Sequence, residues 1–188
     1  MARATATDVD AIAASLPGSE LGVSWGDRPT WKVGGKGFLL YRAPHVSAID
    51  PASGEPFTDL LVVILPDMEA KETLVQADGP FFDIPHFRNH PGVLVQLSRL
   101  GEIDRDELVE VITEAWAHRA PRTVVAEYFG EPPDPFDGLS APARRALAGA
   151  GITTAERAAA APDDGLLALH GFGPKALRTL RENLRAGG

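Results

Sequence analysis

The chain has no cysteine, two methionines, two tyrosines and no apolar run longer than LLVVIL at positions 60–65. Without cysteine there can be no disulfide framework, no thiolate nucleophile and no thiolate-bound metal. A membrane-spanning helix needs about 20 apolar residues, so this run is too short to be one. The first residues place an acidic pair before the apolar ones, unlike the basic-then-apolar order of a signal peptide. We therefore expect a cytoplasmic protein with no membrane partner.

Negative charge dominates the chain, but it is not evenly spread. The net charge is −8 over 188 residues. Residues 1–138 hold 11 Lys and Arg against 22 Asp and Glu, a balance of −11, whereas residues 139–188 hold 7 against 4, a balance of +3. Since phosphate binding depends on Lys and Arg, the basic end is the better candidate for a nucleic-acid contact.

A proline-rich stretch separates the acidic and basic parts. The segment GEPPDPFDG, residues 130–138, contains three prolines and two glycines. Proline restricts itself and the preceding residue to extended conformations, which favours a semi-stiff spacer. We predict a domain over 1–129, a linker over 130–138 and a second domain over 139–188.

The first domain reads as α+β with mainly antiparallel strands. A helix is expected to end at Ser15, and PTWKV and FLLYR flank a glycine-rich turn as a hairpin. Two further strands, TDLLVVIL and GVLVQLS, surround a helix capped by Asp67. A long amphipathic helix opens at Asp104, and a short one follows over 121–129. The expected core includes all three tryptophans, Trp25, Trp31 and Trp116.

Three segments of this domain carry a family resemblance: SLPGSELGVSWGDRPTWKVGGKGF, DLLVVILPDMEAKETLVQADGPFFDIPHF and GVLVQLSRLGEIDRDELVEVITEAWAHRAPRTVVAEYF. Over Asp10 to Phe129 the chain resembles the MmcQ/YjbR family. The resemblance implies a small cytoplasmic domain with a frataxin-like α-β sandwich, in a family for which a DNA-binding surface is proposed by structural analogy.

The basic end reads as a small all-α domain of short helices. Ser140, Thr154, Asp163 or Asp164, and Pro174 give the helix starts. Ten apolar residues are expected to form one core: Leu139, Leu147, Ile152, Leu166, Leu167, Leu169, Phe172, Leu177, Leu180 and Leu184. The LS opening, the GIT turn and the spacing from LL to GFGPK resemble the helix-hairpin-helix domain that ends the alpha polypeptide of RNA polymerase, over Leu139 to Leu184.

The stretch LHGFGPKALRTLRENL, from Leu169 to Leu184, is the main candidate site. A tight turn before a helix leaves backbone N–H groups unpaired at the positive end of the helix dipole, where an anion is favoured. The alternative is a turn that only lets two helices pack. We predict an interface for nucleic acid, DNA above all, with Phe172 as a buried pin, made by His170, Gly171, Phe172, Gly173, Lys175, Arg178 and Arg145.

The helix-hairpin-helix resemblance also limits the kind of contact. Pro142 stands where that family carries the arginine that enters the minor groove, and Arg145 stands where it carries an asparagine. The expectation is therefore contact with the nucleic-acid backbone and no base specificity.

Other candidate sites are weaker. His86 and His90 have helical i, i+4 spacing, but Pro85 and Pro91 bracket them and no HExxH pattern is present, so a loop on the sheet is favoured over a metal site. The family resemblance leaves His86 either structural or lining a groove. The GGKG stretch reads as a hairpin turn, beside which Lys32 and Lys36 could form a second basic edge.

No catalytic constellation emerges from the sequence. We expect no enzyme activity, no cofactor and no metal. The alternative to nucleic-acid binding is a protein- or ligand-interaction module whose helix-hairpin-helix tail is purely structural.

Overall fold

The computed structural model describes residues 2–24, 26–130 and 134–186. The chain forms two compact units, Met1–Val125 and Ala126–Gly188. We call them the sheet unit and the helical unit and describe each by itself. None of the helices in the described ranges combines the length and apolar character needed to cross a membrane.

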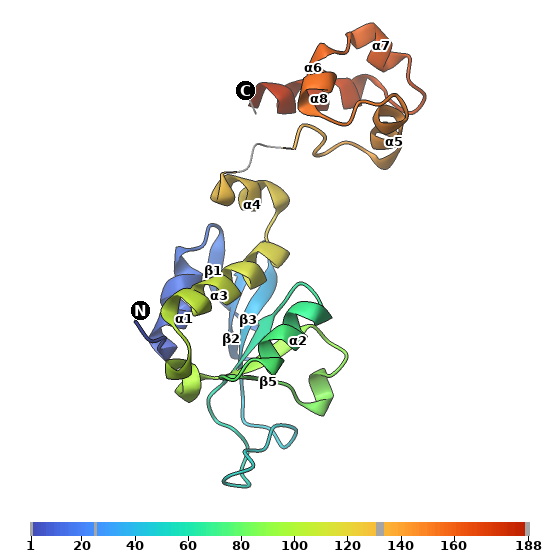
Figure 1. The fold of residues 1–188 in the computed structure, drawn as a ribbon. Coiled ribbons are helices and arrows are strands. Elements are labelled where there is room, and N and C mark those ends of the chain that lie inside the picture. Colours follow the sequence, from blue (N-terminus) through green and yellow to red (C-terminus); the bar gives the residue numbers. More distant parts are fainter. Residues whose placement is uncertain (1, 25, 131–133, 187–188) are drawn as a thin grey trace. The chain divides into compact units, whose positions relative to one another are not determined.

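The sheet unit is built on six antiparallel strands, which confirms the α+β prediction (Figure 1). The order across the sheet is β1-β2-β3-β4-β6-β5. The strands are β1 (Ser19–Ser24), β2 (Arg28–Val33), β3 (Lys36–Arg42), β4 (Leu60–Ile64), β5 (Phe81–Phe82) and β6 (Gly92–Gln96). β2 and β3 form the predicted hairpin.

Two strands escaped the sequence analysis. β1 is an edge strand of sequence SELGVS, in which Leu21 and Val23 are 58% and 57% exposed. None of its six residues is buried, so the strand lacks the alternation of apolar and polar residues by which a half-buried strand is recognised. β5 has two residues, too few for any periodicity.

Helices complete the sheet unit. They are α1 (Ala6–Ser15), α2 (Met68–Gln76) and α3 (Arg105–Arg119), with 3-10 turns at Pro85–Phe87 and Leu97–Glu102. A further helix, α4 (Arg122–Phe129), begins in this unit and continues past its last residue, Val125. Asp67 caps α2 as predicted, since its Oδ1 accepts the Ala70 N–H at 2.9 Å. Asp104 precedes α3, but its carboxylate pairs with Arg3 Nη1 at 3.5 Å and makes no cap hydrogen bond.

The sheet buries apolar side chains on both faces. On β4, Leu61 and Val63 join the core beneath α1 and α3, whereas Leu60, Val62 and Ile64 join a smaller core on the other face. This alternation is the period of two that a strand imposes. Figure 1 shows α1 and α3 together over one face. The second face packs against Phe57, Ile84 and Phe87 from the connecting segments.

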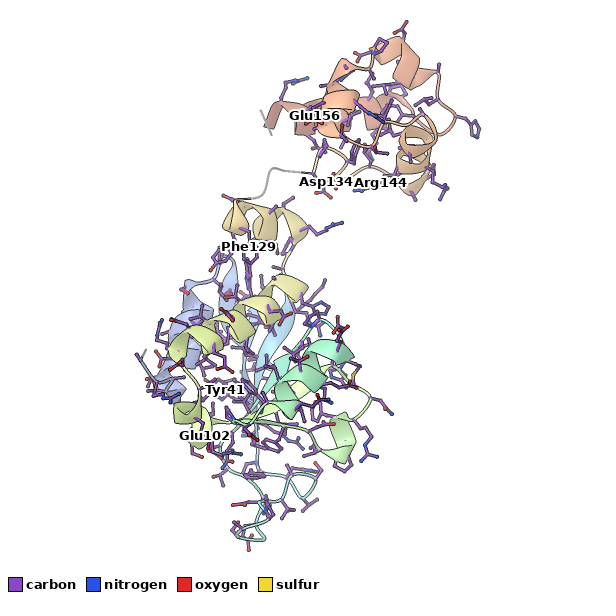
Figure 2. The ribbon with its side chains drawn as sticks, viewed as in Figure 1. Tyr41, Glu102, Phe129, Asp134, Arg144 and Glu156 are labelled. Atoms are coloured by element: carbon purple, nitrogen blue, oxygen red, sulfur yellow. The ribbon has the colours of Figure 1, made fainter. Side chains whose placement is uncertain are left out.

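The tryptophan prediction is confirmed where it can be compared. Trp116 is fully buried and Trp31 is 8% exposed, while Trp25 lies outside the described residues. Asp10 of α1 ties the helix to the sheet, because its Oδ1 accepts from Trp31 Nε1 at 2.7 Å and from the Tyr41 hydroxyl at 2.9 Å. Burial and this carboxylate raise the pKa of Tyr41, which is labelled in Figure 2.

The helical unit contains α5 (Ala141–Gly149), α6 (Ala155–Ala160), α7 (Asp163–Leu167) and α8 (Pro174–Ala186). The caps at Ser140 and Thr154 and the Pro174 start are confirmed. The buried core consists of Leu139, Ala143, Leu147, Ala158, Leu166, Phe172 and Leu180. The prediction for Leu167 is wrong: it is 43% exposed. On the short α7 it lies about 100° from Leu166, so only one of the two faces the core.

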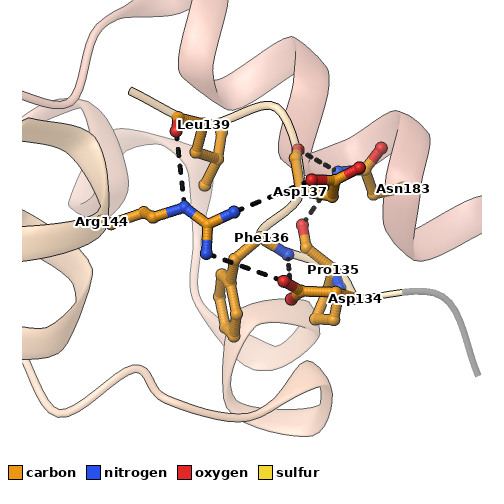
Figure 3. A network of polar contacts seen from close by, with 7 residues as sticks. All are labelled: Asp134, Pro135, Phe136, Asp137, Leu139, Arg144 and Asn183. Atoms are coloured by element: carbon orange, nitrogen blue, oxygen red, sulfur yellow. Dashed lines mark hydrogen bonds and ion pairs between the residues drawn. The ribbon is translucent and has the colours of Figure 1, made fainter. Parts of the chain in front are cut away.

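Residues 134–138 pack as part of the helical unit although the sequence predicts a linker over 130–138. Arg144 of α5 reaches Asp134 at 3.6 Å and Asp137 at 3.9 Å (Figure 3). Asn183 of α8 donates to the carbonyls of Pro135 at 3.1 Å and Asp137 at 2.7 Å. Phe136 packs against the core. This segment is therefore a clamp across α5 and α8, and residues 131–133 of the predicted linker lie outside the described residues.

Candidate nucleic-acid interface

The Gly-Phe-Gly turn connects α7 to α8 in a conformation that depends on Gly171. Its φ is +91°, in the left-handed region that side chains resist. A Cβ at this position would also stand 3.3 Å from the Cβ and the carbonyl oxygen of Pro142. The first turn of α5 thus lies against the Gly-Phe-Gly turn. Phe172 is 3% exposed, which confirms the prediction that its side chain is buried.

Several amides of this turn have no partner in the described part of the chain. The Phe172 N–H donates to Leu169 O at 3.0 Å, and the Leu177 N–H donates to Gly173 O at 3.0 Å. No hydrogen bond between described residues uses the N–H of His170, Gly171, Gly173, Lys175 or Ala176. His170, Gly171 and Lys175 are exposed, and Gly173 is half-buried. The arrangement leaves a group of donors at the positive end of a 13-residue helix, which suits an anion.

Three cationic side chains named by the sequence analysis lie on the helices beside this turn. Lys175 and Arg178 are exposed on the first turns of α8 and share a face by their i, i+3 spacing. Arg145 is exposed on α5, three residues after Pro142, which touches the turn. None of the three makes an ion pair or side-chain hydrogen bond with a described residue. Their charges are available to a ligand.

The other arginines of the helical unit hold its loops. Arg181 donates to the Ala158 carbonyl at 2.8 Å and pairs with Asp163 at 2.7 Å. Arg157 donates to Gly151 O at 2.8 Å, and Arg144 holds the clamp. Sequence spacing on α8 does not separate Arg181 from Arg178, because only the fold shows which of them meets a loop.

The predicted second basic edge divides between two faces. Lys32 is opposite Gly37 in the hairpin, and Lys36 is opposite Val33, whose side chain is buried beneath the helices. Residues opposite each other share a face and neighbours alternate, so the two lysines point to opposite sides. Lys32 Nζ also donates to Val23 O at 2.6 Å.

His86 and His90 lie on either side of Phe87. Their rings meet the Phe87 ring edge-on, with centroids 5.3 Å and 5.8 Å away. Pro85–Phe87 forms a 3-10 turn and not the α-helix on which i, i+4 spacing would face both imidazoles to one ion. Across the described ranges, no group of three or more His, Cys, Asp or Glu is placed to hold a metal.

Comparison with known proteins identifies the sheet unit. The YjbR family model matches residues 14–118, more than half of the chain. The chain belongs to the YjbR family. The matched range runs from α1 through the whole sheet to α3 and ends before α4, so the helical unit lies outside it.

The YjbR relatives carry no assigned activity in their names. The chain is 36% identical over 105 residues to Uncharacterized protein Rv2570 of Mycobacterium tuberculosis and to Uncharacterized protein Mb2600 of Mycobacterium bovis. Each alignment covers 53% of this chain and 78% of the relative. No solved structure matches the chain.

Proposed function

We propose that this YjbR protein binds the backbone phosphates of nucleic acid, with DNA as the favoured ligand. We also propose that the helical unit is a helix-hairpin-helix module formed by α7, the Gly-Phe-Gly turn and α8. The carrying observation is the coincidence of unpaired amides and unpaired cations at one turn. A cytoplasmic location, as expected from the sequence, would suit this function.

The physical basis is the chemistry of phosphate. Backbone N–H groups at a helix start offer directed donors to one phosphate, and the helix dipole favours its negative charge. Lys175 and Arg178 would reach neighbouring phosphates along the strand, and Arg145 would approach from α5. Contacts of this kind carry no sequence information.

The expected affinity is low and depends on salt. A module that neutralises about 2 to 3 phosphates should give a slope of log K against log salt of about −2 to −3. Its dissociation constant should fall in the non-specific range of roughly 10⁻⁴ to 10⁻⁶ M.

The test is titration of the full chain with a fluorescent duplex at several salt concentrations. Lys175→Glu should weaken binding about tenfold or more and make the slope shallower by about one unit. Arg185→Glu is the matched control: it makes the same charge change on the same helix, about 15 Å from Lys175 along the axis. Equal losses in both variants would indicate a diffuse charge effect and not a site at the turn.

A second pair of variants separates the backbone amides from the charges. A Cβ on Gly173 would meet no atom within 4 Å, so Gly173→Ala should leave the fold intact while placing a methyl group among the unpaired amides. We expect weaker duplex binding at unchanged thermal stability. Wild-type affinity in both Gly173→Ala and Lys175→Glu would overturn the proposal and favour a structural tail.

A further inference from the structure

The loop-covered face of the sheet unit carries a groove that the nucleic-acid proposal does not use. Two adjoining hollows, of about 350 Å³ and 460 Å³, share His86 and Phe87 as a common wall. Leu40, Ile64 and Phe87 contribute apolar surface to the first hollow. Each is within the size range of small-molecule sites, which combine apolar walls with a few fixed polar groups.

The groove is cationic although its unit is acidic. Residues 1–125 carry 11 Lys and Arg against 18 Asp and Glu. Among the described lining residues there is no carboxylate. Three arginines supply the positive charge, Arg28, Arg42 and Arg119, and three histidines lie beside them, His45, His86 and His90. Arg28 is paired with Asp27 at 3.3 Å on the exposed rim, so Arg42 and Arg119 are the charges left for a ligand.

The guanidinium group of Arg42 is held in place but lacks a hydrogen-bond acceptor for one of its nitrogens. Its Nη2 donates to Ser47 Oγ at 2.6 Å, and its guanidinium lies 5.6 Å from the centre of the Phe87 ring. Its Nη1 is buried and has no hydrogen-bond partner in the described part of the chain. A fixed guanidinium with an unused buried N–H is poised to bind an oxyanion.

Arg119 repeats this situation at the other hollow. It is the last residue of α3, and its Nε is buried without a partner among the described residues. Beside it, His90 Nδ1 accepts the Gly92 N–H at 3.0 Å, so the proton of the neutral ring is on Nε2, which is a donor. Partial burial and the charges of Arg119 and Lys71 hold the pKa of His90 below its ordinary value.

The wall between the hollows is anchored from behind. Lys71 of α2 is buried, and its Nζ donates to the carbonyls of Phe87 at 2.6 Å and His90 at 3.1 Å. It also pairs with Asp83 at 2.9 Å. The segment that carries His86, Phe87 and His90 is therefore fixed before any ligand arrives, as a preformed site requires.

We propose that this groove binds a small organic anion, with its carboxylate or phosphate at Arg42 or Arg119 and its apolar body against Phe87. An oxyanion would supply the acceptors that the two guanidinium groups lack, and the Phe87 ring with Leu40 or Ile64 favours a flat or aliphatic body over a bare ion. The inference is independent of the nucleic-acid proposal, because all the lining residues lie in the sheet unit.

Benzoate and phenyl phosphate are suitable probes, with benzamide as the neutral analogue and inorganic phosphate as the anion without a body. Each is titrated into the full chain and followed by the amide and histidine resonances of the 85–92 segment. Benzoate or phenyl phosphate should shift these resonances saturably, and benzamide and inorganic phosphate should bind at least about tenfold more weakly. Preference for benzoate or for phenyl phosphate identifies the anionic group.

Variants locate the anion and can overturn the proposal. Arg42→Gln or Arg119→Gln should raise the dissociation constant about tenfold or more, and whichever does so marks the occupied end. Arg122→Gln is the control, since Arg122 is exposed on α4 and lines neither hollow. If Arg42→Gln alters the fold, Arg42→Lys keeps the charge without the planar fork. Equal binding of benzamide and benzoate would overturn the organic-anion proposal. Wild-type benzoate affinity in both Arg42→Gln and Arg119→Gln would overturn it as well. Duplex binding should be unchanged in Arg119→Gln, which separates this outcome from that of the nucleic-acid test.

Discussion

The sheet unit and the helical unit place their cationic side chains differently. In the sheet unit, Lys71 is sealed beneath the 85–90 segment, while Arg42 and Arg119 face a groove. In the helical unit, three arginines fasten loops and the clamp, and four other cations face outward without described partners: Arg145, Lys175, Arg178 and Arg185. A balance of charges over a segment therefore says little about which charges a ligand can reach.

The difference follows from the size of the two cores. The sheet unit buries apolar residues on both faces of a six-stranded sheet, whereas the described part of the helical unit has one small core of seven buried residues among helices α5 to α8. A small core leaves loops that apolar burial alone does not hold, and arginine bonds to their carbonyls supply part of the missing order. Four predictions sharpen this comparison.

The largest effect is expected at the buried cation of the sheet unit. Lys71→Met should lower the free energy of unfolding of this unit by about 3 to 5 kcal/mol, because it leaves Asp83 and two carbonyls without their partner. Urea denaturation followed by tryptophan fluorescence measures it, since all three tryptophans belong to this part of the chain. Adding Asp83→Asn to Lys71→Met should recover part of the loss. No recovery would mean that the ion pair is not the cause.

A core truncation in the helical unit tests whether the two units unfold separately. Leu180 is fully buried, so Leu180→Ala should destabilise the helical unit by about 2 to 5 kcal/mol. Amide exchange should show lost protection in α5 to α8 and unchanged protection in the sheet. Lost protection in β4 or β6 would contradict independent units.

Replacing Arg181, which holds two loops, should destabilise the helical unit less than the core truncation. It should destabilise the unit more than replacing an arginine that has no described partner. Arg181→Gln removes the contacts to Ala158 and Asp163 and should cost about 1 to 3 kcal/mol. Arg178→Gln, one turn away on the same helix, should change thermal stability little because Arg178 has no described partner. Thermal unfolding of the two variants side by side checks the division, and equal losses would refute it.

The smallest effect is expected at the start of α1 and depends on pH. Asp8 accepts from the Thr5 hydroxyl at 2.6 Å, the Thr5 N–H at 2.9 Å and Arg105 Nε at 2.9 Å. The Thr5 and Arg105 hydrogen bonds lower its pKa below 3.8, so folding favours the carboxylate. Its contribution is present above 3.8 and disappears as pH falls through the lowered value. Asp8→Asn should thus lower the thermal unfolding temperature at neutral pH and lower it less in strong acid. Thermal unfolding of the variant and the wild type from neutral pH down to strong acid measures the difference.

Periodicity and capping predicted most of the fold. The strand of Leu60–Ile64, the cap at Asp67 and the Pro174 start all follow from local patterns that the structure retains. Leu167 was misassigned because two adjacent leucines on one turn are equivalent in sequence. The clamp at 134–138 was read as a spacer, because its partner Asn183 is 46 and 48 residues away from the two carbonyls that it binds. The nearby Arg144 carries no local signal that marks it as an ion-pair partner of Asp134 and Asp137.

The two candidate sites also differ in how far the sequence could predict them. The Gly-Phe-Gly turn is a contiguous motif, so its residues could be named before the fold was known. The groove draws Arg42, His86 and Arg119 from three elements more than thirty residues apart, and no local pattern links them. His86 alone was noticed, through a family segment, as a residue that could line a groove.

The fold constrains the two glycines of the turn differently. At position 171 the backbone conformation and the close approach of Pro142 disfavour a side chain, so folding alone favours glycine there. At position 173 the φ angle is ordinary and the surrounding space is open, so folding would tolerate alanine or serine. If homologous tails keep glycine at 171 but carry other residues at 173, the turn serves only to pack the helices. Glycine at both positions in every homologous tail would indicate that a ligand must contact the backbone of this turn.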